Sequence, residues 1–141
     1  MMYIGMGEAK KIFIVEDDLA LLETLQEIFE LHGYQCQSCH EPEKAIGLIE
    51  NYHPDLIVLD YLLPDWNGGE LCAAIRAIDG FQNIPIIITS AYAKILYSLS
   101  EYGCDAVLEK PFSIHQMINL VSKLLSKKNS RNSLLPGIKL S

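Results

Sequence analysis

The chain has 141 residues, which is the usual size of one compact domain. Half of the residues are hydrophobic and 21% are charged, as in ordinary globular proteins and unlike disordered chains or fibres. The formal net charge of −7 disfavours nonspecific binding to nucleic acid or to anionic membranes, because these partners are themselves negative.

The first nine residues precede any regular pattern, and we interpret them as an N-terminal extension. No signal peptide is recognisable, since Lys10 and Lys11 lead into only a few apolar residues before the acidic run Glu16–Asp18. The apolar run Ile84–Ile88 is far shorter than the roughly 20 residues of a membrane-spanning helix. We therefore expect a cytoplasmic protein without a membrane segment, in which the four cysteines remain free thiols.

Apolar runs and amphipathic stretches alternate five times along the chain, which is the pattern of a parallel sheet connected by helices. The expected strands cover residues 11–15, 34–39, 55–59, 84–89 and 105–108. The first expected helix begins after Asp18 and ends before Gly33, and the others cover residues 41–51, 70–78, 92–102 and 113–125. The sequence thus predicts an α/β fold with helices on both faces of the sheet.

Polar side chains follow four of the expected strands at the point where each strand ends. Glu16 and Asp17 follow the first strand, Asp60 ends the third, Ser90 follows the fourth, and Lys110 follows the fifth. In an open parallel sheet, ligands bind at the carboxyl ends of the strands, where the strand order reverses. We therefore expect these five side chains to share one site.

The chemistry of this set points to phosphoryl transfer. Three carboxylates in one cleft repel one another unless a cation lies among them, and oxygen ligands without histidine or cysteine favour Mg²⁺. A lysine and a hydroxyl beside the metal can bind the oxygens of a phosphoryl group. A carboxylate can then act as the nucleophile and form an acyl phosphate, and Asp60 is the candidate.

Five segments at these positions resemble the bacterial response-regulator receiver family, and the resemblance covers residues 10–126. They are Val15-Glu16-Asp17-Asp18, Leu59-Asp60-Tyr61-Leu62-Leu63-Pro64, Gly68, Pro85-Ile86-Ile87-Ile88-Thr89-Ser90-Ala91 and Lys110-Pro111-Phe112. Each motif is weak alone, but all five occur in the order and at the separations typical of the family. The resemblance implies a flavodoxin-like, doubly wound, three-layer fold with five strands in the order 2-1-3-4-5 and five helices. Residues 127–141 would then be a C-terminal tail or a truncated linker.

The resemblance also implies a role for each site residue. Asp60 would be the phospho-acceptor, with Glu16, Asp17, Asp60 and the backbone carbonyl of Leu62 holding Mg²⁺. Ser90 would be the switch hydroxyl, with Thr89 as the alternative, and Lys110 would pair with the phosphate. The Lys110–Pro111 bond resembles the family's cis peptide.

The function implied is that of a phosphorelay switch in two-component signal transduction. A sensor histidine kinase or a histidine phosphotransfer protein would donate the phosphoryl group. Phosphorylation would change which downstream effector protein or output domain binds, and a homodimer is left open. The domain would catalyse its own modification and would not be a turnover enzyme.

Two departures from the family pattern favour an alternative function. The segment between Ser90 and Lys110 is about two residues shorter than the family's, and Val107 occupies the usual position of the switch aromatic. A phosphorylation-independent receiver-like interaction module is therefore the second hypothesis, and a fragment of a larger regulator or hybrid kinase is the third. Leu62 and Tyr92 resemble the family's two variable positions beside the phosphoryl group, where bulky apolar side chains should exclude water.

Cys36, Cys39 and His40 match the C-x-x-C-H pattern of covalent haem attachment. We expect instead that both cysteines pack within the second strand, because residues three apart on a strand point to opposite faces of the sheet.

Overall fold

A computed structural model of the chain describes residues 8–92 and 102–133. Its five strands form one parallel sheet in the order β2-β1-β3-β4-β5, with the bounds β1 Lys11–Val15, β2 Gln35–Cys39, β3 Leu56–Asp60, β4 Ile86–Ser90 and β5 Ala106–Glu109. Its helices are α1 Leu19–Leu31, α2 Pro42–Tyr52, α3 Gly68–Arg76 and α4 Ile114–Ser133. The predicted fold class and strand order are confirmed.

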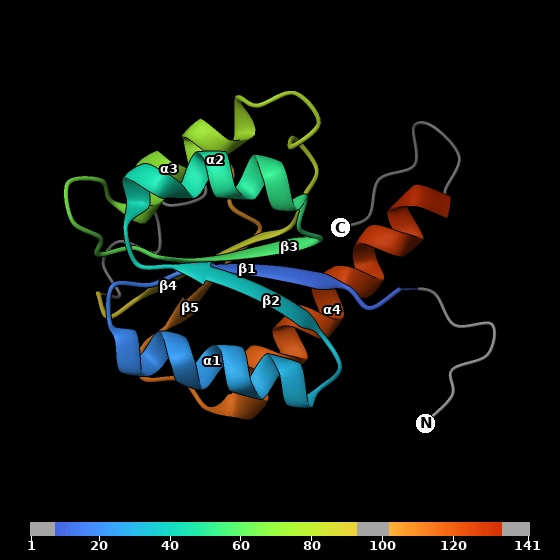
Figure 1. Ribbon diagram of the computed structural model, residues 1–141. Helices are drawn as coiled ribbons and strands as arrows, with labels where there is room; N and C mark the ends of the chain where they lie inside the picture. The colour runs from blue at the N-terminus through green and yellow to red at the C-terminus, as the bar shows by residue number, and fades with distance from the viewer. Residues whose placement is uncertain (1–7, 93–101, 134–141) are drawn as a thin grey trace.

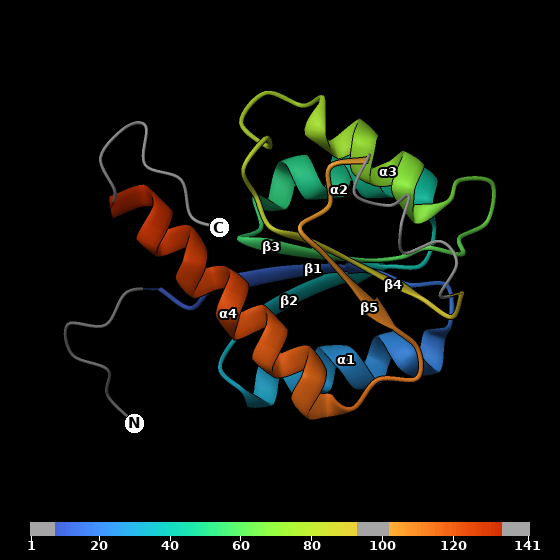
Figure 2. The same cartoon turned by 180° about the vertical axis from the view of Figure 1, so that it is seen from behind.

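The sheet is the middle one of three layers. Figures 1 and 2 show α2 and α3 on one face and α1 and α4 on the other. Side chains alternate along each strand, so Phe13 and Ile57 pack in the core under α2 and α3, whereas Ile14 and Val58 pack in the core against α1 and α4. The central strands are apolar on both faces because both faces are covered.

The strand order reverses next to β1, and this reversal positions the site. Strand β1 pairs with β2 on one side and with β3 on the other. The connections through α1 and α2 therefore leave the sheet toward opposite faces, which opens a crevice beyond the carboxyl ends of β1 and β3. Glu16 and Asp60 come directly from these two strand ends.

The predicted boundaries of the described elements hold to within two residues, except at the end of α4. Helix α3 begins at Gly68, because Asn67 caps it: the Asn67 side chain accepts from the Glu70 N–H, and the Glu70 side chain accepts from the Asn67 N–H. Helix α4 continues past Leu125 to Ser133, through Ser, Lys, Asn and Arg residues that tolerate a helix and contain no Pro or Gly. The helix predicted over residues 92–102 lies almost wholly outside the described residues.

The C-x-x-C-H segment is part of the sheet, as predicted. Both thiols belong to β2, but Cys36 packs with the core against α1 and α4, and Cys39 packs with the core under α2 and α3. Burial raises the thiol pKa to about 12 for Cys36 and to about 11 for Cys39, so both thiols remain protonated. Thiols on opposite faces of one strand cannot bind one haem, and none of the four cysteines forms a disulfide.

Within residues 8–92 and 102–133, none of the helices combines the length and the apolar character that a membrane crossing requires.

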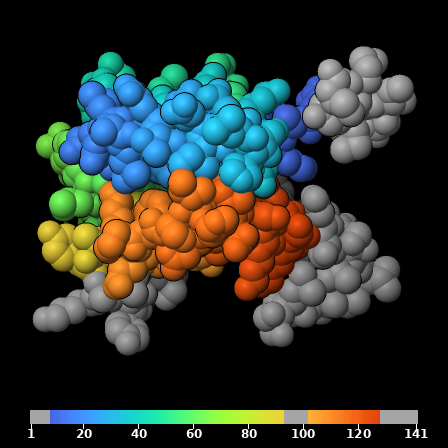
Figure 3. All heavy atoms as spheres, turned by 90° about the horizontal axis from the view of Figure 1, so that it is seen from below, coloured from blue at the N-terminus to red at the C-terminus, as the bar shows by residue number. Residues whose placement is uncertain are grey.

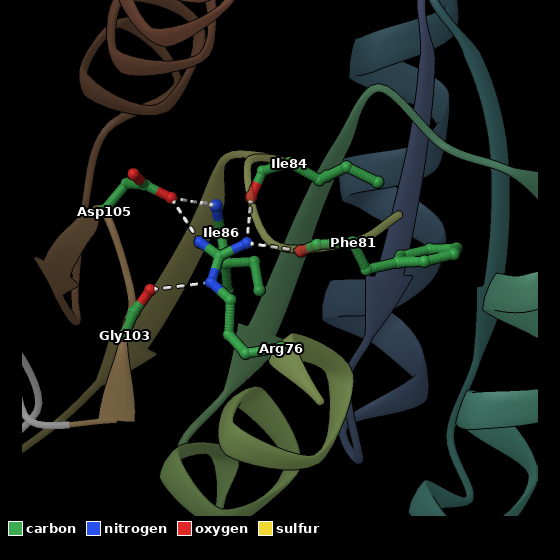
Figure 4. Close-up of polar contacts among 6 residues, drawn as sticks. All are labelled: Arg76, Phe81, Ile84, Ile86, Gly103 and Asp105. Atoms are coloured by element: carbon green, nitrogen blue, oxygen red, sulfur yellow. Dashed lines mark hydrogen bonds and ion pairs between the residues drawn. The ribbon is translucent and has the colours of Figure 1, made fainter. Parts of the chain in front are cut away.

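Arg76, the last residue of α3, ties three segments together at the amino-terminal side of β4 and β5 (Figure 4). Its guanidinium donates to the carbonyls of Gly103, Phe81 and Ile84 and pairs with Asp105 at 2.8 Å. The same Asp105 oxygen accepts from the Ile86 N–H. One planar guanidinium fork thus binds the two segments that lead into β4 and β5 at once.

Replacing this fork should destabilise the fold. We expect Arg76→Lys to lower the free energy of unfolding by about 2 kcal/mol, because an ammonium keeps the charge but cannot reach all four oxygens. Urea denaturation measures the change in the free energy of unfolding. The control is Lys44→Arg, the reverse exchange at an exposed position. Wild-type stability of Arg76→Lys would show that the fork geometry is unimportant.

Candidate functional site

Glu16 extends directly from β1 into the crevice, and it is 2% exposed. Its Oε1 accepts a hydrogen bond from Lys110 Nζ at 3.1 Å, and its Oε2 accepts one from the Asp18 N–H at 3.1 Å. Asp18 in turn caps α1, since its side chain accepts from the N–H groups of Ala20 and Leu21. The start of α1 therefore holds the Glu16 carboxylate in a defined orientation.

Asp60 is the last residue of β3 and is 7% exposed. The chain behind it is closed into a tight loop, because the Gly68 N–H donates to the Tyr61 carbonyl at 2.7 Å. A methyl group at Gly68 would lie 2.5 Å from the Asp60 carbonyl oxygen, so only glycine allows this close approach. The backbone that carries Asp60 is consequently packed against the first residue of α3.

Lys110 reaches the site from the end of β5, on the far side of β4. Its N–H donates to the Ser90 carbonyl at 2.8 Å, and the following bond to Pro111 is cis, as predicted. Its ammonium lies 3.3 Å from Asp60 Oδ1 as well as 3.1 Å from Glu16 Oε1. Residues 16, 60 and 110, which are far apart in sequence, therefore meet in one buried ion-pair cluster.

The charges within this cluster do not balance. Burial first, and then the neighbouring carboxylate of Asp60, raise the pKa of Glu16 to about 7. Burial alone lowers the pKa of Lys110, but the carboxylates of Asp60 and Glu16 outweigh it and raise that pKa above its usual value. Lys110 therefore stays protonated, yet one ammonium is not enough for two buried carboxylates.

The other predicted site residues lie around this cluster. Ser90 is 1% exposed, and its Oγ accepts a hydrogen bond from the Tyr92 N–H at 3.0 Å. Thr89, the alternative hydroxyl, is equally buried and lies beside Asp60 in the register of β3 and β4. Leu62 is 62% exposed and follows Asp60 in the loop.

Asp17 is the predicted residue that does not join the cluster. It is exposed, and no group of three or more His, Cys, Asp or Glu side chains within residues 8–92 and 102–133 is close enough to hold a metal. Two carboxylates already occupy the crevice, and their repulsion favours an outward orientation of a third. The donor set nonetheless fits a hard cation, because Glu16 and Asp60 offer buried carboxylate oxygens with only one ammonium between them.

A cavity of about 360 Å³ opens next to the cluster. It is lined by Leu21, Ala91, Lys110, Pro111 and Phe112. Leu21 belongs to α1, which lies beside α4 in the space-filling view of Figure 3. The sequence reasoning assigned no role to Leu21, because its helical spacing is the same as that of a core residue.

The chain is similar to known proteins over most of its length. A model of the response regulator receiver domain matches residues 12–122. The "Response regulator MprA" of Mycobacterium sp. (strain KMS) is 29% identical over 119 residues, which are 83% of this chain and 51% of that protein. The chain thus spans about half the length of the curated relatives it matches.

Two solved structures extend the similarity to three dimensions. The CheY-like response regulator receiver domain protein from Methanospirillum hungatei JF-1 has a TM-score of 0.82 at 26% identity, covering 88% of this chain and 99% of that one. The signal receiver domain of a signal transduction histidine kinase from Syntrophus aciditrophicus has a TM-score of 0.79 at 28% identity, covering 94% and 99%.

Proposed function

The chain belongs to the response regulator receiver domain family of two-component signalling, and from that premise we propose that Asp60 accepts a phosphoryl group from a phosphohistidine. The observation that carries the proposal is the position of Lys110, whose ammonium lies 3.3 Å from Asp60 Oδ1 and 3.1 Å from Glu16 Oε1. A cation at this point is well placed to bind the oxygens of a phosphoryl group arriving at Asp60.

In the proposed step, a carboxylate oxygen of Asp60 attacks the phosphorus atom and forms an O–P bond. The N–P bond of the donor histidine breaks, and its electron pair remains on the imidazole nitrogen. Lys110 and the hydroxyl of Ser90 hold two of the phosphoryl oxygens as charge builds up on them. The product is an acyl phosphate on Asp60.

Glu16, Asp17, Asp60 and the Leu62 carbonyl would hold Mg²⁺. When bound there, the metal would supply positive charge that offsets these carboxylates and the charge of a phosphoryl group. Glu16 is already oriented for this role by the Asp18 N–H and Lys110. Asp17 follows it directly in sequence and lies exposed just before α1.

The proposed donor is a protein, a sensor histidine kinase or a histidine phosphotransfer protein. The cavity beside Lys110 is lined largely by apolar side chains, which suits a protein side chain better than a small charged metabolite. The output is a change in binding, either to an effector protein or to an output domain. A second copy of the phosphorylated chain is one such partner, and the product would then be a homodimer.

The proposal is tested with acetyl phosphate and Mg²⁺, followed by intact-protein mass spectrometry. The wild type should gain the mass of one phosphoryl group, and Asp60→Asn should gain none. Asp65→Asn, in the exposed loop nearby, is the control and should react like the wild type. No gain by the wild type, or an equal gain by Asp60→Asn, contradicts the proposal, and the former result favours the phosphorylation-independent interaction module.

The lifetime of the acyl phosphate should depend on the two apolar side chains beside the site. Leu62 is 62% exposed and Tyr92 is 53% exposed, so both can shield a phosphoryl group from water. We expect the acyl phosphate to decay several-fold faster in a Leu62→Asn, Tyr92→Glu double variant than in the wild type. Phosphate release measures the decay. Leu31→Asn, at an exposed leucine at the end of α1, is the control and should decay like the wild type. Equal decay rates in the wild type and the double variant would contradict this prediction.

A further inference from the structure

The ring of Tyr102 lies directly on the first turn of α3. A methyl group at Gly69, the second residue of that helix, would lie 2.5 Å from Cδ2 and 2.6 Å from Cε2 of the ring. Contacts this short do not occur between real atoms, so any side chain larger than hydrogen at this position would displace the ring. Tyr102 is half-buried and packs against the core under α2 and α3.

The same helical turn also packs against the backbone of Asp60. A methyl group at Gly68 would lie 2.5 Å from the Asp60 carbonyl oxygen and 2.9 Å from the Tyr61 Cα. Two adjacent glycines thus allow two close contacts of the turn. The backbone of the candidate acceptor residue makes one of them, and the Tyr102 ring makes the other.

Tyr102 is itself held in place by the other end of α3. The carbonyl of the next residue, Gly103, accepts a hydrogen bond from Arg76 Nε at 3.0 Å, which Figure 4 shows. Arg76 also binds Asp105, just before β5. The backbone beside the ring is therefore bonded to α3, the same helix that the ring contacts. The close packing of the ring supports the first turn of this helix.

The position of this helical turn determines the position of residues 61–67. That loop is closed at its base by the Gly68 N–H to Tyr61 carbonyl bond at 2.7 Å and by a bridge between Leu62 and Asn67. Asn67 also caps α3, so the loop cannot move independently of the helix. A shift of the first turn of α3 would therefore shift the Leu62 backbone.

We propose that Tyr102 is a positioning residue, whose ring holds loop 61–67 in the geometry that binds a divalent cation. The proposal rests on the proposed function, in which the Leu62 carbonyl is a metal ligand. The ring acts through Gly69 and does not touch the metal. The packing of the Tyr102 ring positions the loop, so the Tyr102 hydroxyl group is not required.

Magnesium affinity tests the role directly. Trp66, the only tryptophan, lies in the loop and is 39% exposed, so its fluorescence can follow a Mg²⁺ titration, with calorimetry as an independent measure. We expect Tyr102→Ala to weaken Mg²⁺ binding about tenfold, as the loss of a supporting contact does at other metal sites. Tyr102→Phe should bind like the wild type.

Two further variants separate positioning from a loss of stability. Phe29→Leu, in the core on the opposite face of the sheet, should lower the melting temperature without changing Mg²⁺ affinity. Gly69→Ala alone should weaken Mg²⁺ binding, and adding Tyr102→Ala should restore part of it, because the methyl group then occupies space that the ring has left. Tyr102→Leu replaces Tyr102→Ala if the latter does not fold.

The outcomes distinguish the two proposals. A wild type that does not bind Mg²⁺ by calorimetry overturns the proposed function, and the role of Tyr102 with it. A wild type that binds Mg²⁺ while Tyr102→Ala binds equally well overturns only the positioning role. Weaker binding by Tyr102→Ala and not by Phe29→Leu or Tyr102→Phe supports it.

Discussion

Glu16→Gln should make the metal-free protein more stable at pH 8, although it removes a residue from the site. The reason is the imbalance of charge in the crevice, where burial and the Asp60 carboxylate raise the pKa of Glu16 to about 7. Ionisation of Glu16 is therefore less favourable in the folded protein than in the unfolded chain, and this difference lowers the free energy of unfolding. Glutamine keeps the shape of the side chain and removes this cost.

The effect has a defined pH dependence. Below the ordinary value of 4.5, Glu16 is protonated in both the folded and the unfolded states, so the substitution changes little. Between about 4.5 and 7 the unfolded chain releases its proton and the folded protein retains it, so wild-type stability falls as the pH rises. Above pH 7 the difference is complete, and we expect it to be on the order of 2 kcal/mol.

Magnesium should reverse the order of the two proteins. Addition of Mg²⁺ at pH 8 should raise the melting temperature of the wild type, because the metal binds only the folded state, and should leave Glu16→Gln nearly unchanged. Glu27→Gln on the exposed face of α1 is the matched control and should respond to Mg²⁺ like the wild type. A metal-free Glu16→Gln protein that is less stable than the wild type at pH 8 would contradict this account of the crevice.

Lys110→Gln should have the opposite effect on the metal-free protein. It removes the ammonium that lies within 3.3 Å of both Glu16 and Asp60 and leaves two buried carboxylates without a counter-charge. We expect a loss of about 2 kcal/mol of stability at neutral pH, and a smaller loss in Mg²⁺, because the metal can offset the same carboxylates. Denaturation with and without Mg²⁺ measures both quantities.

The same substitution should slow phosphoryl transfer to Asp60. Loss of one charged group that stabilises a transition state typically costs about a hundredfold in rate, so phosphorylation by acetyl phosphate in saturating Mg²⁺ should slow by about that factor. Lys123→Gln, on the exposed face of α4, makes the same charge change and should alter neither stability nor rate. A Lys110→Gln protein that reacts at the wild-type rate would remove Lys110 from the chemistry.

The sequence predicted the sheet and the meeting of Glu16, Asp60 and Lys110 because both follow from strong local patterns. The strands β1, β3 and β4 are mainly apolar runs, and the parallel topology brings the strand ends to one edge. The helix start after Asp18 is predictable for the same reason, since its side chain accepts only from the nearby N–H groups of Ala20 and Leu21. These features depend on neighbours in sequence or on topology alone.

Other features depend on contacts between distant segments, which no local pattern encodes. The packing of Tyr102 on Gly69 and the bonds of Arg76 to the segments before β4 and β5 join residues that a single sequence cannot pair. The end of α4 was also misjudged, because a polar helix without an apolar stripe has no periodicity to mark its limit. The exposure of Asp17 depends on the folded surroundings of Glu16 and Asp60, and no motif carries that information.

The most direct measurement identifies the residue that carries the phosphoryl group. Protein treated with acetyl phosphate and Mg²⁺ is reduced with sodium borohydride, which converts an aspartyl phosphate to homoserine, and the peptides are sequenced by mass spectrometry. Homoserine should be found at position 60 and at no other aspartate. Homoserine at Asp17 or Asp65, with aspartate intact at 60, would contradict the central claim that Asp60 is the acceptor.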